Sequence, residues 1–258
     1  MKDGFFTTSD GVRLHYVTGG QGAPLLLLTG YSGSTEDFTA SYDVLCSRFN
    51  VICMDYRGHG KSDVPDSGCH IERLAKDLEE LLSFLGIGEF YLLAHSMGNT
   101  VAWCFMELFG QARIRGYVLY EESPCLLSDP GWTEAEQNRY LGKFRMPDGW
   151  SFPAMPPGGG AIDPRRAAFL SRLVREHLSR DWRDVVESIR IPTLILMGEG
   201  SHFGARELWD YLHDSIPGSY LEVIPAEQGG SHMFHRENPE RFQELVLAFF
   251  GEMQTDGE

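Results

Sequence analysis

The sequence predicts an α/β fold built on a largely parallel β-sheet. Short apolar runs recur along the chain, and helical patterns occupy most of the segments between them. A strand of a parallel sheet has this continuous apolar character because both of its faces are covered. The runs that we expect to be strands are residues 25–29, 51–54, 90–94, 117–120, 193–197 and 220–224.

Helices are indicated where apolar residues recur with a period of about 3.6 residues. One such stripe is Leu74, Leu78, Leu81 and Leu85, and a second, near the C-terminus, is Phe242, Leu245, Val246 and Phe249. At the N-terminus, an Asp10-Gly11 turn separates two alternating segments, which predicts an antiparallel hairpin that leads into the sheet. Strands that alternate with helices place the chain in the α/β class.

The interval 125–190 breaks this alternation, because it contains no convincing strand. Helical patterns surround a passage rich in proline and glycine, "MPDGWSFPAMPPGGG". We therefore expect a helical cap at 125–190, inserted into a core of residues 1–124 and 191–258. Apolar side chains of the cap could line a substrate pocket or could only pack the cap onto the core. The pocket candidates are Trp132, Trp150, Phe152, Met155 and Phe169.

The charge and composition of the chain argue against several classes of partner. The formal net charge is −15 at pH 7, which disfavours nucleic acids, anionic membrane surfaces and polyphosphate substrates because like charges repel. A small-molecule substrate that is neutral or apolar fits this charge better. No apolar run approaches the ~20 residues that cross a bilayer, and the opening residues contain no signal-peptide core. We therefore expect a cytoplasmic protein.

Metal and disulfide sites are not indicated by the cysteines, which are odd in number, scattered and without Cys-x-x-Cys spacing. They are Cys46, Cys53, Cys69, Cys104 and Cys125. The chain also lacks a strand-linked Gly-x-Gly-x-x-Gly segment, so we expect neither a metal nor a nucleotide cofactor. The sequence leaves open whether the chain forms a homo-oligomer.

A candidate nucleophile lies in the segment "YLLAHSMGNTVAW", residues 91–103. Ser96 stands where an apolar strand ends and a helix begins. A sharp strand-to-helix turn places the serine oxygen above the sheet edge and needs small neighbours, here Ala94 and Gly98. The helix N-terminus behind the serine favours a developing negative charge. Because Ala94 replaces the first glycine of the Gly-x-Ser-x-Gly motif, the context rather than the motif alone indicates a nucleophile.

A serine needs a base within hydrogen-bond reach to act as a nucleophile, and the C-terminal region offers two histidines. His232 lies on a glycine-flanked loop after the strand at 220–224, and His235 lies three residues later. Two histidines at this spacing, with no third ligand nearby, make a poor metal site. We expect a histidine of this loop to serve as the base.

Taken together, these segments resemble the α/β-hydrolase fold family over essentially the whole chain. The matching segments are "TGYSGS" at 29–34, "DYRGHGKSD" at 55–63, the turn at Ser96, and the loop in which "ENP" follows His232. The resemblance implies a mostly parallel eight-stranded sheet flanked by helices, with a helical cap. It selects His232 over His235, because the family histidine stands five residues before the glutamate of "ENP". It also assigns the oxyanion hole to the backbone amides of Tyr31 and Met97.

The acidic member of the triad is where the sequence departs from the family. The family usually offers an aspartate three residues after the glycine that here is Gly198, and this chain has Ser201 there. Zearalenone-type lactonases and haloalkane dehalogenases of this superfamily carry their acid after an earlier strand, and that position here is Glu121. Glu122 is the runner-up because a bulge would exchange the two side chains, and Glu199 is third. The glutamate pair could also be a solvated sheet edge.

The resulting hypothesis is a cofactor-independent serine hydrolase. His232 would take the proton of Ser96, Ser96 would attack a carbonyl, and Glu121 would orient the imidazole before water releases the acyl group. We expect a carboxylic ester or a lactone as substrate; epoxide hydrolases and dehalogenases are disfavoured because their nucleophile is an aspartate. Two alternatives stay open. One is hydrolysis of a carbon–carbon bond in a β-diketone-like substrate, and the other is a ligand sensor on a hydrolase scaffold, which Ser201 supports.

Overall fold

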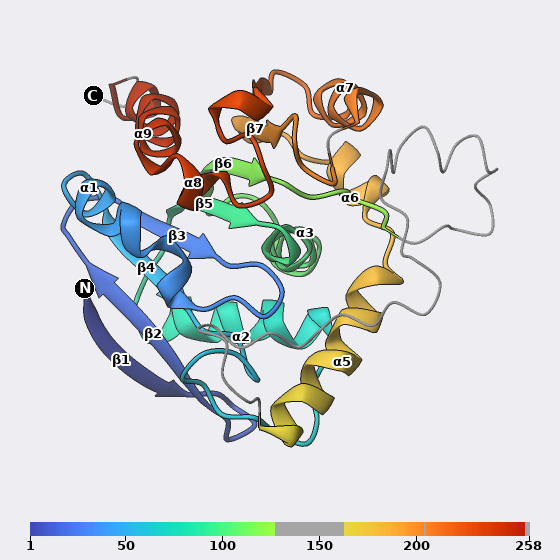
Figure 1. The fold of residues 1–258 in the computed structure, drawn as a ribbon. Helices are drawn as coiled ribbons and strands as arrows, with labels where there is room; N and C mark the ends of the chain where they lie inside the picture. Colours follow the sequence, from blue (N-terminus) through green and yellow to red (C-terminus); the bar gives the residue numbers. More distant parts are fainter. Residues whose placement is uncertain (127–162, 204, 256–258) are drawn as a thin grey trace.

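The computed structural model describes residues 1–126, 163–203 and 205–255, and their strands form one eight-stranded sheet (Figure 1). The order across the sheet is β1-β2-β4-β3-β5-β6-β7-β8. The strands are β1 (Lys2–Thr7), β2 (Arg13–Gly19), β3 (Pro24–Leu28), β4 (Asn50–Met54), β5 (Phe90–His95), β6 (Ile114–Tyr120), β7 (Thr193–Gly198) and β8 (Tyr220–Ile224). The hairpin β1–β2 is antiparallel and joins β4 in antiparallel fashion, whereas all other neighbours are parallel. The predicted fold class is therefore confirmed.

Helices cover both faces of this sheet, with α1 and α9 on one side and α2 and α3 on the other (Figure 1). The α-helices are α1 (Tyr42–Cys46), α2 (Ile71–Phe84), α3 (Met97–Phe109), α5 (Pro164–Leu178), α6 (Arg183–Glu187), α7 (Arg206–Ser215), α8 (Phe234–Glu237) and α9 (Pro239–Thr255). Two 3-10 helices, η1 (Thr35–Ser41) and η2 (Ala226–Gln228), complete the described elements. None of the described helices is both long and apolar enough to cross a membrane.

The alternation of side chains along β3 shows how one sheet supports two cores. Successive side chains of a strand point to opposite faces, and every residue of the run 25–28 is buried. Leu26 and Leu28 join the core formed with α2 and α3, while Leu25 and Leu27 join the core formed with α1 and α9. This is why the strands read as continuous apolar runs rather than as alternating ones.

Strand β6 differs from its predicted extent, because it begins at Ile114 rather than at Tyr117. Ile114 pairs with Phe90, and a register shift follows before Gly116 pairs with Tyr91. Arg115 and Gly116 interrupt the apolar run, so the apolar pattern marks only the second half of the strand. Pairing with the neighbouring strand β5 extends β6 towards its N-terminal end.

The described part of the interval 125–190 contains α5 and α6 and no strand; an isolated bridge joins Cys125 to Asp181. Helix α5 is anchored to the core at its middle, where the buried Phe169 ring lies against Gly58 so closely that a Cβ there would stand 2.4 Å from the ring. Four of the pocket candidates, Trp132, Trp150, Phe152 and Met155, lie outside the described residues, whereas the fifth, Phe169, packs against Gly58. The cap therefore stays a prediction.

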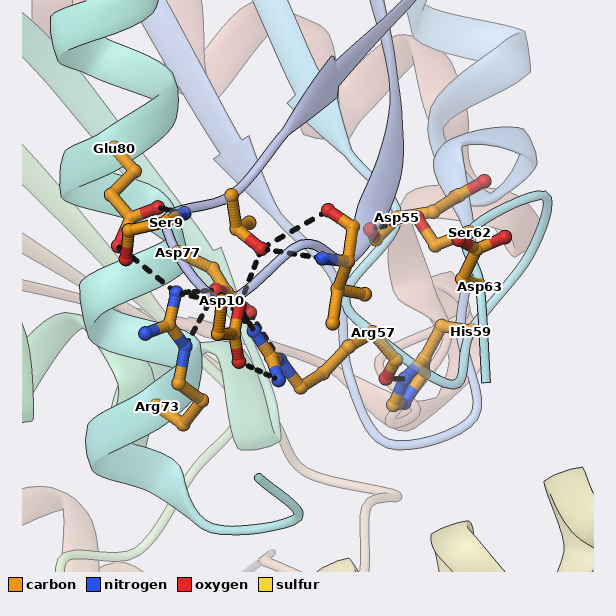
Figure 2. A network of polar contacts seen from close by, with 12 residues as sticks. Ser9, Asp10, Asp55, Arg57, His59, Ser62, Asp63, Arg73, Asp77 and Glu80 are labelled. Carbon is orange, nitrogen blue, oxygen red and sulfur yellow. Dashed lines mark hydrogen bonds and ion pairs between the residues drawn. The ribbon is translucent and has the colours of Figure 1, made fainter. Parts of the chain in front are cut away.

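The turn that follows β4 is held by a buried ion-pair network, which Figure 2 shows. The buried guanidinium of Arg57 donates to both carboxylate oxygens of Asp77 on α2, at 2.6 and 2.7 Å. It also donates to Asp10 of the N-terminal hairpin turn, at 3.0 and 3.1 Å. Arg73 donates to Asp77 from the same helix, one turn away. The network ties the hairpin, the turn and α2 together.

Candidate active site

The residues predicted to carry chemistry gather at one edge of the sheet. Ser96 directly follows β5, Glu121 directly follows β6, and His232 lies on the loop after β8. Tyr31 belongs to the loop after β3, so each of the four residues stands beyond the carboxyl end of a parallel strand. Open α/β sheets place their functional groups at this edge.

Ser96 has the strained backbone expected of a sharp strand-to-helix turn. Its φ of 53° and ψ of −132° lie outside the regions that ordinary residues adopt. Close packing explains the small neighbours: a Cβ at Gly98 would stand 2.8 Å from the carbonyl oxygens of Leu28 and Thr29. Ala94, in place of the usual first glycine, is fully buried within β5, so the core accommodates its methyl group.

A chain of hydrogen bonds joins the three predicted triad residues. His232 Nε2 lies 3.1 Å from Ser96 Oγ, and His232 Nδ1 lies 3.1 Å from Glu121 Oε2. A carboxylate only accepts hydrogen bonds, so Nδ1 carries the ring proton and Nε2 presents a lone pair to the serine hydroxyl. In this arrangement the imidazole can accept the serine proton.

The Glu121 carboxylate is completely buried and is held by two further donors. The backbone N–H of Gly198 donates to Oε1 at 2.5 Å, and the hydroxyl of Ser201 donates to Oε2, the oxygen that faces His232. These two donors hold the carboxylate in the orientation in which Oε2 faces His232. Ser201 stands where the family usually has its acid, and here it supports the acid that comes from another strand. Sequence analysis missed this role.

The other glutamates and the second histidine lie elsewhere. Glu199 is exposed, and its carboxylate accepts from the backbone N–H of Ala226 at 3.2 Å. Glu122 is fully buried and points to a different group, described below. His235 is buried behind the site, with Nδ1 3.2 Å from the Tyr120 hydroxyl. Of the candidate acids, Glu121 is the one whose carboxylate contacts His232.

Two side chains that sequence analysis did not consider hold the loop of His232. The carbonyl oxygen of His232 accepts from His95 Nε2 at 2.8 Å and from the Tyr120 hydroxyl at 3.2 Å. Burial lowers the pKa of His95 well below its usual value, so the ring is neutral. One signal for this role was visible, since His95 directly precedes Ser96 at the end of a buried strand.

The loop after β3 approaches Ser96 closely enough to supply an oxyanion-hole amide. A Cβ at Gly30 would stand 2.9 Å from Ser96 Cβ, which places Tyr31 directly beside the serine. Met97 is the first residue of α3, and the N–H groups of a first helical turn have no acceptor within the helix. Burial raises the pKa of the Tyr31 phenol to about 12, so this side chain is neutral as well.

Ser96 and His232 open into a cavity of about 200 Å³ in the described part of the molecule. Helix α5 supplies one wall with Val174, His177 and Leu178, and the segment after β7 supplies His202 and Phe203. Such a mixture of apolar walls and a few polar groups is typical of small-molecule sites. The remaining lining residues are Tyr31, Glu122 and Leu126.

Comparison with known proteins identifies the family of the fold. The model of the alpha/beta hydrolase fold family matches residues 23–176, which include β3 to β6 and the turn at Ser96. The chain belongs to the alpha/beta hydrolase fold family. The matched range contains the loop after β3 and the nucleophile turn, whereas the loop of His232 lies beyond it.

Among relatives of this hydrolase, a protein named soluble epoxide hydrolase from Corynebacterium sp. (strain C12) is 38% identical over 280 aligned positions, which cover 95% of this chain and 96% of the relative. A thermophilic esterase from Thermogutta terrifontis has a TM-score of 0.77 at 24% identity, covering 98% and 99% of the two chains. The enol-lactonase from Burkholderia xenovorans LB400 has a TM-score of 0.73 at 19% identity, covering 96% and 100%. The likeness to these two structures shows the fold alone.

Of α5, sequence analysis named only Phe169 and not the residues that line the hydrolase cavity. Phe169, Leu173, Val174 and His177 lie on one helical face, with His177 only 5% exposed. The apolar stripe was visible in the sequence and would predict a buried face. It does not say which end of the helix meets Ser96, because that depends on how α5 crosses the core.

Proposed function

We propose that the protein is a serine hydrolase that cleaves carboxylic ester or lactone bonds through an acyl-enzyme intermediate. The observation that carries the proposal is the continuous hydrogen-bonded chain from Ser96 through His232 to the buried Glu121. A nucleophile, a base and a group that orients the base are the three parts that such chemistry needs. The chain holds all three without help from another molecule.

In the first half of the reaction, Ser96 Oγ attacks the substrate carbonyl carbon while its proton moves to His232 Nε2. The backbone N–H groups of Tyr31 and Met97 stabilise the negative charge on the carbonyl oxygen. The Glu121 carboxylate stabilises the imidazolium, which then gives its proton to the leaving alcohol. Water repeats these steps on the acyl-enzyme, with His232 again as base, and releases the acid.

The relative named soluble epoxide hydrolase raises the alternative of epoxide opening, and the identity of the nucleophile argues against it. Attack by a serine oxygen on an epoxide carbon would leave an ether on Ser96, which has no carbonyl for water to attack. Attack on an ester or lactone leaves an ester on Ser96, which water can hydrolyse by the same machinery. The hydroxyl of Ser96 therefore favours a carbonyl substrate.

Hydrolysis of a carbon–carbon bond in a β-diketone-like substrate remains the second candidate, because it would use the same nucleophile and base. The ligand-sensor hypothesis rested on the absence of a triad acid at position 201. Because Glu121 contacts His232 in its place, this argument for a sensor no longer holds. A substrate panel separates these candidates.

The test is turnover of p-nitrophenyl acetate and butyrate, of a panel of lactones, of a β-diketone and of styrene oxide. We expect ester or lactone hydrolysis that Ser96→Ala abolishes, while Ser83→Ala, at an exposed position on α2, keeps full activity. An organophosphonate probe should label the wild type and not the Ser96→Ala variant. Turnover that survives Ser96→Ala, or turnover of the epoxide alone, would overturn the proposal.

A further inference from the structure

Glu122 is a buried carboxyl group that the proposed reaction does not use. It is 0% exposed, one residue from Glu121, and it lines the same cavity as Ser96. Its Oε1 accepts from the backbone N–H of Ser123 at 2.8 Å. Its Oε2 has no hydrogen-bond partner among the residues that the structure describes. A buried polar atom without a partner costs free energy, so its retention needs an explanation.

The group that faces this oxygen is His177 of α5, which lines the cavity too. His177 Nε2 lies 3.6 Å from Glu122 Oε2, too far for a direct hydrogen bond. The other ring nitrogen, Nδ1, lies 3.4 Å from Thr100 Oγ. Because the Thr100 hydroxyl donates its proton to the Met97 carbonyl at 2.9 Å, its oxygen accepts from Nδ1–H. Nε2 is therefore left as an acceptor that points towards Glu122.

Both members of this pair are neutral in the folded protein. Burial, reinforced by the nearby charge of Glu121, raises the pKa of Glu122 well above its usual value. Burial also lowers the pKa of His177 to about 3. The pair thus presents one donor, the proton on Glu122 Oε2, and one acceptor, the lone pair on His177 Nε2.

We propose that Glu122 and His177 form a hydroxyl-binding subsite beside Ser96, so that the preferred esters or lactones carry a free hydroxyl group. A hydroxyl oxygen that lies about 2.8 Å from both atoms accepts from Glu122 and donates to His177. An ether lacks the proton that His177 needs, and a carboxylate would introduce a charge into a neutral pocket. The inference rests on the proposed function, because the subsite selects among substrates of Ser96.

The test compares esters that differ only by a hydroxyl group. Suitable substrates are the p-nitrophenyl esters of hexanoic, 3-hydroxyhexanoic and 6-hydroxyhexanoic acid, together with ethyl and 2-hydroxyethyl hexanoate. We expect kcat/KM of the wild type to be about 10- to 100-fold higher for at least one hydroxyl-bearing ester than for its unsubstituted partner, the factor that a hydrogen bond to a buried group supplies.

Variants of Glu122 and His177 test whether these two side chains cause the preference for a hydroxyl group. Glu122→Met and His177→Phe should each bring the ratio of the two kcat/KM values to near 1. Glu122→Gln should keep most of the preference, because its amide can still accept from Ser123 and donate to a hydroxyl. Glu199→Met, which alters an exposed carboxylate at the end of β7, is the matched control and should keep the wild-type ratio. Since both esters are measured on the same preparation, a partly unfolded variant does not distort the ratio.

The outcomes separate this inference from the proposed function. If hexanoate is hydrolysed in a Ser96-dependent way but no hydroxyl-bearing ester is preferred, the subsite is wrong and the hydrolase stands. The subsite is also wrong if Glu122→Met leaves the preference intact, or if Glu122→Gln removes it as fully as Glu122→Met does. If no ester or lactone is turned over, both proposals fail.

Discussion

Glu121 Oε2 lies 3.1 Å from His232 Nδ1 and accepts the hydroxyl proton of Ser201, the residue that occupies the usual acid position of the family. The acid of the triad therefore lies at the end of β6, next to β7, and the residue at the usual acid position donates a hydrogen bond to it. The backbone of Glu121 adopts a positive φ of 58°, which turns its side chain towards the histidine loop. A non-glycine residue in this region marks a site where structure constrains the backbone for function.

Glu121→Gln should lower kcat for the best ester by about 10² to 10⁴, because the amide keeps the shape of the carboxylate but not the charge that balances the imidazolium. Steady-state kinetics measures this effect, and circular dichroism checks that the fold is retained. Glu199→Gln, the same change at an exposed carboxylate, should leave kcat at the wild-type value. A strong loss in Glu199→Gln with little effect in Glu121→Gln would show that the acid is wrongly assigned.

Ser201→Asp should rescue the Glu121→Gln variant, because it returns a carboxylate to the position beside His232 that the family usually employs. We expect kcat of the double variant to be about 10-fold or more above that of Glu121→Gln alone, since a charged hydrogen bond contributes about 1.5–3 kcal/mol. Glu121→Gln combined with Ser201→Ala is the control and should show no recovery. Equal activities of the two double variants would contradict the interpretation of Ser201 as the displaced acid position.

Arg57→Met should destabilise the protein by about 3–5 kcal/mol, because it leaves the buried Asp77 carboxylate without its main partner. The free energy of unfolding in urea measures the loss. Arg165→Met breaks an exposed ion pair with Asp66 and should cost about 0–1 kcal/mol. Similar losses in the two variants would show that the buried network of Figure 2 does not hold the hairpin to α2.

Stability should fall below about pH 6.5 because four buried histidines are neutral in the folded state. Burial lowers the pKa of His59 to about 4, those of His177 and His235 to about 3, and that of His95 well below its usual value. Between the ordinary value of 6.5 and these lowered values, the unfolded chain binds protons that the folded chain does not. The stabilisation is therefore complete above pH 6.5 and is lost as the pH falls.

Urea unfolding at pH 7, 6 and 5 measures this dependence, and each histidine contributes a slope that approaches about 1.4 kcal/mol per pH unit. His59→Gln should reduce this slope by up to about 1.4 kcal/mol per pH unit, because the variant lacks one ring that binds a proton on unfolding. A slope that is the same in the wild type and in His59→Gln would contradict the neutral state of the buried ring.

The sequence by itself determined the class of the fold and the local setting of three functional positions. Apolar runs buried on both faces mark the central strands, and the junction of such a run with a helix marks Ser96 as well as the amide of Met97. His232 was identified from the spacing of its loop residues in a family pattern. These features depend on neighbours in the chain, so a pattern of a few residues is enough to predict them.

Only the tertiary structure decided which acid meets His232 and what lies around the nucleophile. Glu121 and Glu122 are adjacent and equally buried, and the positive φ of Glu121 sends one carboxyl to the histidine and the other to the cavity wall. Likewise, Ser201 meets Glu121 and His177 meets Glu122 because β6 lies beside β7 and because α5 crosses the core near α3. The pairing of strands and the packing of helices set these contacts. The sequence pattern of a single segment cannot predict these contacts, because each contact joins side chains that are distant along the chain.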